Sequence, residues 1–531
     1  MAIFRKKEIA TNEFDQVIVG TSLTKEAWKR LKKNKLAVVG SVIVIIYALV
    51  ALCADLLPLY PYDQAVTSHR NLRPSLTKTA GELMMEQEMK NLFFQAWRGG
   101  RLELSDEEDA QIETWIQQSK TNNVWDLVYA RGMQAIEEGT FEWNSSEQRK
   151  IDNLLEDIET ETLITINSVS APVDGEMVSI EDMDYDTILS LYAQLIGADI
   201  ELVSQSMYNE VSAAVTNELR ANDSSLTGED LTAAVEMEMD AMGEDAFQNR
   251  AVQNIIGYIE QIAQRSASSD INSLITSGQA QLPYRGTFDL SNGLHVELEV
   301  SRVHERRYIC GTDYLGRDLL SRIIYGSQIS IAIGLVGTIT SIFIGILVGA
   351  LAGYLGGKVD YYLMRFVDIM YGLPYMLLVI ICMAIFGRNI INLFFALALV
   401  SWLTIARMVR GQIMSLKNQE YVEAARSMGG STMHIIFRHM IPNSLSIIIV
   451  YSTIRIPAFI MQESFLSFLG LGVQAPYASW GSLIGDAVSS MALYPYKLII
   501  PSIIMVIFLF SMNFLGDGLR DAFDPQSKNQ L

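Results

Sequence analysis

Long apolar segments near both ends of the chain restrict what it can fold into. The first, Leu36–Ala54, runs for nineteen residues without a charge and follows nine Lys and Arg residues. A helix of this length crosses about 30 Å of hydrocarbon, and the segment is longer than the apolar region of a cleaved signal peptide. Five more apolar runs follow: Gln328–Leu355, Tyr371–Phe386, Ile390–Ile405, Ser444–Leu469 and Leu498–Leu515. The sequence therefore predicts a membrane all-α protein with six transmembrane helices.

The positive charges predict how these helices are oriented. With six crossings, eighteen Lys and Arg residues fall on one side of the membrane, whereas the short loops of the other side hold Arg388, with Lys497 at a border. Because cytoplasmic loops are enriched in Lys and Arg, we expect the N- and C-termini to be cytoplasmic.

The segment after the first helix differs in composition from the rest of the chain. Residues 61–300 contain 43 acidic and 14 basic side chains, and the remaining residues contain 17 acidic and 26 basic ones. This division excludes a single globular domain. It also argues against nucleic acid as a partner, because the acidic segment repels phosphate. We predict three parts: 1–60 with the first helix, an extracytoplasmic insertion domain over 61–303, and a five-helix core over 304–531.

The insertion domain reads as mainly helical. Its helical signals are two capping-box spacings and two segments with helical apolar periodicity, namely Ser105/Glu108, Ser145/Gln148, Ile151–Ile166 and Ile188–Leu219. Near its end, Asn292-Gly293 is a hairpin-turn dipeptide, and apolar residues alternate with polar ones over Leu294–Val300. These patterns predict a small α+β domain.

No pattern in the chain indicates covalent chemistry or a metal. The zinc-helix and Gly-x-Ser-x-Gly nucleophile motifs are absent, and the three cysteines are scattered. The glycine-rich stretch 353–358 lacks the spacing of a phosphate loop, and the acidic stretch 106–109 lacks that of a calcium loop. We therefore expect a chain that is not an enzyme, binds no metal or cofactor, and does not itself hydrolyse ATP.

A loop between two predicted membrane helices carries the most informative motif. It contains Glu423-Ala424-Ala425-Arg426, then Gly429, and later Pro442 where the next apolar run begins. Small Ala side chains allow another protein to approach closely, and Gly429 permits a turn with positive φ. The alternative interpretation is a solvated connector.

The spacing of this loop resembles the coupling-loop signature of ABC importer permeases. Further segments are similar to the oligopeptide/dipeptide type of that family, in particular to its C-type subunit: Gly311-Thr312-Asp313, Gly316-Arg317-Asp318, Ser464–Gly472, Ser479-Trp480-Gly481 and Gly516–Asp521. The resemblance covers residues 1–60 and 304–531. The insertion, and the lead-in His304–Cys310, depart from the family pattern, so the resemblance says nothing about their roles.

This resemblance implies a type I ABC importer permease fold in the plasma membrane of a prokaryote. It implies as partners a second homologous permease subunit, two ATP-binding subunits that hydrolyse ATP, and an extracytoplasmic peptide-binding protein that delivers a peptide substrate. The coupling residues would be Glu423, Ala424, Ala425, Arg426, Gly429 and Pro442. Their loop would convert closure of the ATPases into rocking of the membrane helices.

Two charges inside the fifth apolar run are candidates for a substrate pathway. Arg455 and Glu463 are eight positions apart, about 80° around a helix, so both could face one cavity. Ionisable groups in a membrane helix usually face a cavity or a partner. Alternatively, Glu463 lies near the outer interface and Arg455 reaches the interface or pairs with the partner subunit.

Other functions stay open at this point. They are a permease for a non-peptide solute such as nickel, a membrane-anchored receptor whose acidic ectodomain binds a ligand, and a secondary transporter. The coupling-loop spacing favours the permease over the receptor, and the inverted repeats of many secondary transporters are not evident. For the insertion we favour a docking surface for the binding protein or a cap over the outer mouth.

Overall fold

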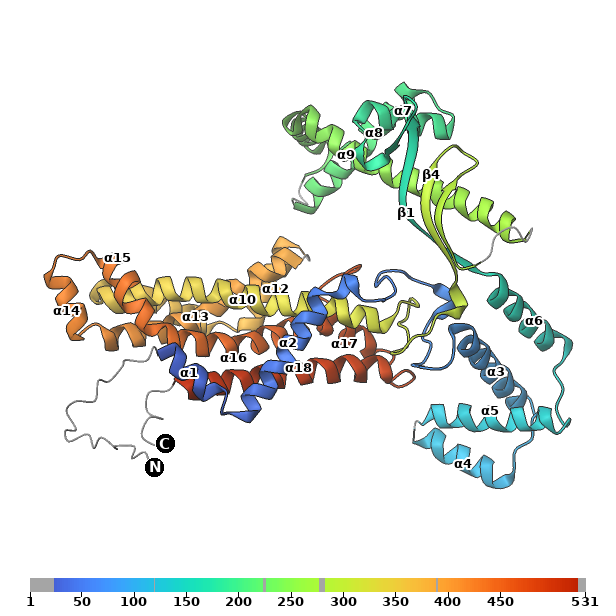
Figure 1. Cartoon of the computed structure of the whole chain (residues 1–531), viewed down its shortest axis with the longest axis horizontal. Coiled ribbons are helices and arrows are strands. Elements are labelled where there is room, and N and C mark those ends of the chain that lie inside the picture. The colour runs from blue at the N-terminus through green and yellow to red at the C-terminus, as the bar shows by residue number, and fades with distance from the viewer. Residues whose placement is uncertain (1–22, 119, 223–225, 277–281, 388–389, 524–531) are drawn as a thin grey trace, which may run out of the picture. The chain divides into compact units, whose positions relative to one another are not determined.

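A computed structural model describes residues 23–118, 120–222, 226–276, 282–387 and 390–523. Their contacts divide the chain into two compact units, shown together in Figure 1. The large unit comprises the described parts of Met1–Lys78, Glu82–Thr140 and Arg307–Leu531, and the small unit comprises Thr79–Gly81 and Phe141–Arg306. The small unit is thus narrower than the 61–303 range that the sequence suggested, because the helices of residues 82–140 group with the large unit.

Long apolar helices form the body of the large unit. Its principal helices are α1 (Leu23–Leu31), α2 (Lys35–Leu52), α10 (Leu319–Leu355), α11 (Gly357–Gly372), α12 (Tyr375–Phe386), α13 (Ile390–Leu416), α16 (Ile441–Phe468), α17 (Trp480–Val488) and α18 (Tyr496–Phe523). Among the described residues, four helices (α2, α10, α13 and α18) are long and apolar enough to cross a membrane. The number rises to seven if each of three bent helix pairs counts as one span.

One predicted helix is broken. The run Tyr371–Phe386 spans the end of α11 and the whole of α12, which meet at 86°. The break falls at Leu373 and Pro374, because a residue before proline is disfavoured in the helical conformation. A second bent pair, Thr432–Leu445 and Ile447–Phe468, meets at 64°.

Glycines allow α10 and α13 to pack closely. Gly345, Gly349 and Gly353 are spaced four residues apart on α10, and a Cβ on any of them would collide with α13. Small residues at this spacing let helix backbones approach each other in membrane proteins. Apolar side chains of α13, including Ile405, fill the adjacent core.

Three further helices of the large unit are α3 (Ala80–Arg98), α4 (Asp106–Gln117) and α5 (Thr121–Glu137). The predicted capping box is confirmed at the start of α4, where Ser105 and Glu108 exchange hydrogen bonds. Phe94 and Trp125 stack with ring centroids 4.3 Å apart.

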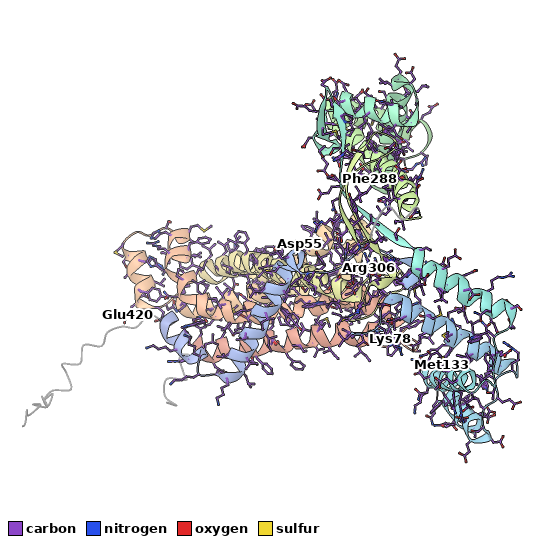
Figure 2. The ribbon with its side chains drawn as sticks, turned by 45° about the vertical axis from the view of Figure 1, so that its right-hand side comes forward. Asp55, Lys78, Met133, Phe288, Arg306 and Glu420 are labelled. Atoms are coloured by element: carbon purple, nitrogen blue, oxygen red, sulfur yellow. The ribbon has the colours of Figure 1, made fainter. Side chains whose placement is uncertain are left out.

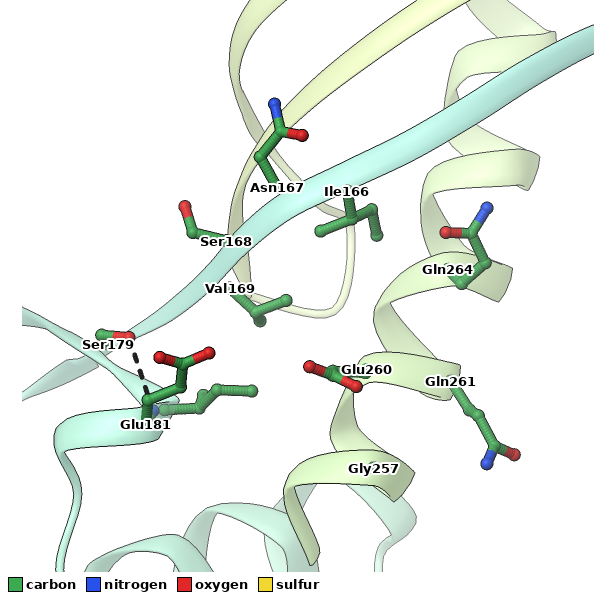
Figure 3. A pocket seen from close by; sticks show the side chains of 11 residues that line it. Ile166, Asn167, Ser168, Val169, Ser179, Glu181, Gly257, Glu260, Gln261 and Gln264 are labelled. Carbon is green, nitrogen blue, oxygen red and sulfur yellow. Dashed lines mark hydrogen bonds between the residues drawn. The ribbon is translucent and has the colours of Figure 1, made fainter. Parts of the chain in front are cut away.

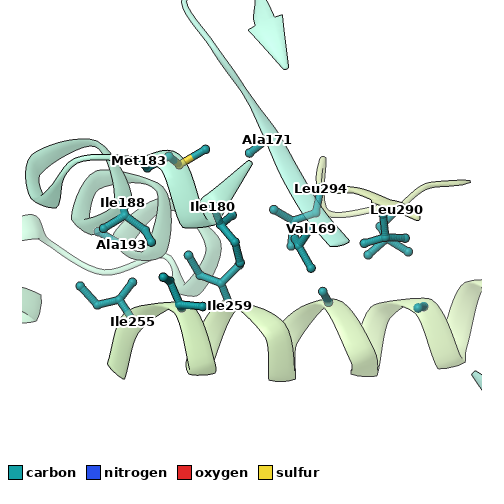
Figure 4. Close-up of a cluster of buried hydrophobic side chains, with 14 of the residues drawn as sticks. Val169, Ala171, Ile180, Met183, Ile188, Ala193, Ile255, Ile259, Leu290 and Leu294 are labelled. Atoms are coloured by element: carbon teal, nitrogen blue, oxygen red, sulfur yellow. The ribbon is translucent and has the colours of Figure 1, made fainter. Parts of the chain in front are cut away.

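The small unit packs helices against a four-stranded sheet. Its elements are α6 (Ser145–Thr160), β1 (Thr162–Val173), β2 (Glu176–Ser179), α7 (Tyr185–Ile196), α8 (Ile200–Asn222), α9 (Gly228–Thr276), β3 (Tyr284–Asp289) and β4 (His295–Arg302). The antiparallel strands have the order β2-β1-β4-β3. Ile255 and Ile259 of α9 pack with Val169 of β1 and with Leu294 beside β4 (Figure 4). The expected hairpin is present, with Gly293 at φ +87°.

Three local predictions for this unit are wrong in detail. The side chain of Asn144, not Ser145, begins α6, since it accepts hydrogen bonds from the amides of Ser146 and Glu147. The predicted helix Ile151–Ile166 ends at Thr160, and the β-branched residues that follow form β1. The predicted helix Ile188–Leu219 is interrupted by Gly197, whose left-handed conformation ends α7.

Candidate functional site

The predicted coupling loop folds as two short helices at one end of the long helices. Helices α14 (Glu420–Ser427) and α15 (Thr432–Ile435) lie at the opposite end of the long helices from α17, and Glu420 marks their position in Figure 2. Val422 and Ala425 are buried and belong to one apolar cluster with Ile413 and Ile435. The loop is therefore packed onto α13 and is not a free connector.

Gly429 makes the turn between the two helices. Its φ is +83°, and nothing lies within 4 Å of the place where a Cβ would stand, so the backbone conformation and not lack of space favours glycine. The amide of Gly430 donates to the carbonyl of Ala425 at 3.0 Å, and that of Met428 donates to Ala424 at 3.0 Å. These bonds close the C-terminus of α14, as in a left-handed helix cap.

The two alanines of the motif face different ways. Ala424 is exposed, as are Glu423 and Arg426, whereas Ala425 is 5% exposed and lies against the loop's own core. The interpretation of Ala425 as an outward contact is therefore wrong: its small side chain fits beneath α15. Glu423 forms no ion pair with any residue that the structure describes.

Pro442 lies in the first turn of α16, directly after a π-helical segment, Ile436–Met440. The chain thus continues from α15 into α16 without an intervening loop.

Arg455 lines a cavity of about 210 Å³ between α11, α12, α13 and α16. One guanidinium nitrogen, Nη2, donates to the carbonyl of Ser401 at 2.8 Å, while Nε is buried without a partner. Hydroxyl and amide groups complete the polar lining, and Tyr375 donates to Gln462 at 2.7 Å. The lining includes no acidic residue.

Two neighbouring arginines, unlike Arg455, form ion pairs with carboxylates. Arg407 pairs with Asp368 at 2.7 Å, and Arg410 pairs with Asp360 at 2.5 Å. Across the described part of the chain, Arg455 forms no ion pair. Its charge is compensated by a carbonyl dipole and by the Phe459 ring, whose centroid lies 5.9 Å from the guanidinium carbon, but by no carboxylate of the described chain, so the cavity favours an anionic group.

Glu463 does not share this cavity. It is fully buried, and its Oε1 accepts hydrogen bonds from Ser467 at 2.5 Å and Ser479 at 2.6 Å. Ser479 in turn caps the N-terminus of α17. The structure therefore does not bring Arg455 and Glu463 together, and Glu463 instead ties α16 to α17.

The segment Gly311–Asp318 encloses a buried charge cluster. Asp313 accepts hydrogen bonds from Arg317 Nε at 2.8 Å and from Arg322 Nη1 at 2.5 Å. All three side chains are at most 7% exposed. Asp318 caps α10 by accepting from the amide of Ser321 at 2.9 Å.

The same segment binds residues 66–72, which follow α2 in the chain. Thr312 donates its hydroxyl to the carbonyl of His69 and accepts from the amide of Leu72. Gly311 and Gly316 both have positive φ, and a Cβ on Gly316 would collide with the carbonyl of Val66. The motif thus has a structural role, holding residues 66–72 against the start of α10.

Some residues around these sites carried no signal in the sequence. Ser401, Tyr375 and Gln462 reach the Arg455 cavity from three different helices. Arg322 belongs to a segment that resembles the permease family, but no local pattern indicates that it pairs with Asp313. Contacts of this kind depend on helix packing, which no local pattern specifies.

Helices long enough to cross a bilayer, with a packed loop at one end, define a multi-pass membrane protein. Comparison with known families agrees. Residues 345–529 match the family model described as "binding-protein-dependent transport system inner membrane component", and residues 22–74 match "N-terminal TM domain of oligopeptide transport permease C". Neither match includes residues 75–344.

Several curated proteins are similar to this chain. The oligopeptide transport system permease protein OppC of Haemophilus influenzae is 46% identical over 224 residues, which cover 42% of this chain and 72% of the relative. OppC of Escherichia coli strain K12 is 47% identical, covering 42% and 74%. The dipeptide transport system permease protein DppC of Bacillus subtilis is 42% identical, covering 41% and 68%. The chain therefore belongs to the family of binding-protein-dependent transport system inner membrane components.

A solved structure of the MetNI methionine ABC transporter in an inward-facing conformation is also similar. It is 19% identical, with a TM-score of 0.33, and the match covers 38% of this chain and 97% of that one. A similarity of this size supports no conclusion about the present chain.

Proposed function

We propose that this chain is the permease subunit of an ABC importer that moves oligopeptides or dipeptides into the cytoplasm. The relatives named as oligopeptide and dipeptide transport permeases support the cargo. The observation that carries the mechanism is the α14–Gly429–α15 loop, which is packed on its inner side and exposed at Glu423, Ala424 and Arg426. A loop that is packed against the helices and exposes one small and two charged side chains is suited to transmit the movement of a bound protein to those helices.

The proposed topology has six crossings. They are α2, α10, the α11/α12 pair, α13, the α15/α16 pair and α18, with both termini cytoplasmic. The excess of Lys and Arg on one side supports this orientation. Residues 61–303 are then extracytoplasmic. The bent pair of the acidic small unit is not counted, since its segment belongs to a water-exposed α+β unit.

The proposed partners are a second homologous permease subunit, two ATP-binding subunits and an extracytoplasmic peptide-binding protein. The ATP-binding subunits supply hydrolysis, and this chain binds no cofactor of its own. Glu423, Ala424, Arg426 and Gly429 present the loop to a groove of one ATPase. Ala425 and Pro442 position the loop from behind and join it to α16.

Within the membrane, we propose that Arg455 binds the carboxylate of a peptide during passage. The guanidinium has a free Nε and no acidic partner among the described residues, and its cavity is lined by both polar and apolar side chains. A buried cation without a counter-ion is costly in a membrane, and an anionic ligand relieves that cost. Glu463 has no part in this step.

A pull-down tests the assignment. The tagged chain is extracted from its native membranes in mild detergent, and its partners are identified by mass spectrometry. We expect Walker-motif ATPases and a second multi-helix subunit in the wild-type sample, and loss of the ATPases from a Glu423→Arg sample. Wild-type chain that retains other membrane partners but no ATPase would contradict the proposal.

A further inference from the structure

In the sheet of the small unit, the edge strand β2 covers only part of its neighbour β1. Strand β2 pairs with β1 only over the four residues Ser170–Val173, where Ser170 faces Ser179. Toward its N-terminus β1 continues to Thr162, paired with β4 on its other side. At Ser179 the chain leaves the sheet for the short helix Ile180–Asp182. Therefore, within the described chain, no strand pairs with β1 on this side beyond the end of β2.

A groove of about 540 Å³ lies in this position (Figure 3). One wall is residues 166–169 of β1, the opposite wall is the exposed side of α9 from Gly257 to Gln264, and residues 179–181 form one end. Its volume is within the range typical of ligand sites, about 300–1,000 Å³. Four strand residues present an edge of about 13 Å, enough for a short extended segment.

Backbone groups of β1 face this groove. The side-chain amide of Gln264 donates to the carbonyl of Ile164 at 3.0 Å, so that carbonyl points away from β4 and toward α9. Peptide groups two residues apart point to the same side of a strand, so those of Ile166 face the groove as well. Open strand edges are usually protected by Pro, Lys, a bulge or a covering element. Residues 166–169 contain neither Pro nor Lys, and β1 bulges between Ile166 and Ser168 where it pairs with β4.

The groove is acidic. Glu181 at the end of the groove and Glu260 on the α9 wall direct their carboxylates into the groove (Figure 3). Neither forms an ion pair within the described residues, and no Lys, Arg or His lines the groove. The remaining polar lining is neutral, from Asn167, two serines and two glutamines. A cationic side chain on an extended backbone complements both the edge and the carboxylates.

We propose that this groove binds an extended basic peptide, which adds to the sheet as a strand along the edge of β1 that β2 does not cover. Backbone hydrogen bonds to the β1 edge supply sequence-independent affinity, as in other strand-addition sites. A Lys or Arg side chain of the peptide lies between Glu181 and Glu260. This site belongs to the small unit alone and does not depend on the transport function proposed above.

The test uses the full chain in lipid nanodiscs, without ATPases. The probe is a fluorescein-labelled heptapeptide, Thr-Lys-Val-Lys-Val-Lys-Thr, with an amidated C-terminus so that it offers no carboxylate to Arg455. We expect saturable binding by fluorescence anisotropy. The double variant Glu181→Gln/Glu260→Gln should weaken the affinity about tenfold, because it removes two solvent-exposed ion pairs. A matched control, Glu297→Gln/Glu299→Gln, removes two exposed carboxylates from β4 and should leave the affinity unchanged.

Modified peptides distinguish strand addition from simple charge attraction. Backbone N-methylation of alternate residues removes the amide donors from one edge of the peptide. One of the two alternating patterns should abolish binding, and the other should bind like the unmodified peptide. Equal binding of both patterns, equal loss in both double variants, or binding only by a folded partner protein would overturn the proposal.

Discussion

Replacing Asp313 by Asn should open the segment 307–318, which leads into α10. The Asp313 carboxylate lies between the guanidinium groups of Arg317 and Arg322, and both arginines are at most 4% exposed. The substitution preserves shape but removes the negative charge. Two buried cations then lose the carboxylate that contacts both of them and keep only the electrostatic interaction with Asp486.

The cost follows from the burial of the cluster. Removing one partner of a buried ion pair typically destabilises a protein by about 3–5 kcal/mol, because the remaining charge is left uncompensated. The segment 307–318 is held to residues 69–75 by backbone hydrogen bonds around Asp313, such as that from the Asn71 amide at 3.0 Å. We therefore expect the loss to appear first as local opening of this segment.

Cys310 reports on that opening. Burial raises the pKa of its thiol from 9.0 to about 11, with a smaller contribution from the Asp318 carboxylate. Because the thiolate is the reactive form, at pH 8 this shift lowers reactivity about 100-fold relative to a thiol with the ordinary pKa. In the opened variant the pKa should return toward 9, and alkylation should accelerate by up to that factor.

The assay is iodoacetamide alkylation of the purified chain across a pH series, followed by mass spectrometry. Cys53 and Cys382 are replaced by Ala so that the signal comes from Cys310. Asp230→Asn, an exposed acid in the small unit, is the matched control. An Asp313→Asn variant that reacts at the wild-type rate, with a wild-type pH profile, would refute the argument that this carboxylate holds the segment closed.

Three further outcomes are expected. Glu423→Arg and Gly429→Pro should each abolish peptide uptake in reconstituted vesicles while the chain still inserts, and uptake near wild type in either would contradict the coupling role. Arg455→Gln should reduce uptake of a peptide with a free carboxylate about tenfold, as expected for losing a hydrogen bond to a charged group, with little effect on its amidated counterpart. Replacing 79–306 by a short linker should preserve assembly with the partner subunits in a pull-down, whereas replacing 62–300 should prevent it, because only the second deletion removes the backbone partners of Thr312 and Asp313.

Patterns within single segments predicted much of the secondary structure. Five of the six apolar runs correspond to α2, α10, α13, α16 and α18, the sixth is split between α11 and α12, and the alternation after Asn292-Gly293 corresponds to β4. These predictions succeed because periodicity and turn chemistry are local properties of the chain. The strand β1 was missed because its residues continue the apolar spacing of the helix before it, and only pairing with β4 selects the extended form.

Predicting the environments of the site residues would have required knowledge of how the helices pack. Gly429 could be predicted to have positive φ, since glycine after an Ala-rich helix commonly ends it. The inward orientation of Ala425 could not, because it depends on where α15 folds back. Likewise, charge alone marked Arg455 and Glu463 as candidates, but their environments differ: one reaches a polar cavity and the other contacts two serines.

The segment around Asp313 also explains how the helical core accommodates the long segment between Ser75 and Tyr308. The chain leaves the helical core near Ser75 and returns at Tyr308, and these residues are joined by a backbone hydrogen bond of 3.0 Å. Loop-closure entropy grows only slowly with length once the ends are fixed. The small unit also has an apolar core of its own, with fully buried Ile188, Ile255 and Ile259. Therefore the length of the chain between Ser75 and Tyr308 matters less to the core than the integrity of its two ends, and substitutions at Thr312 or Asp313 should be more damaging than most changes within the small unit.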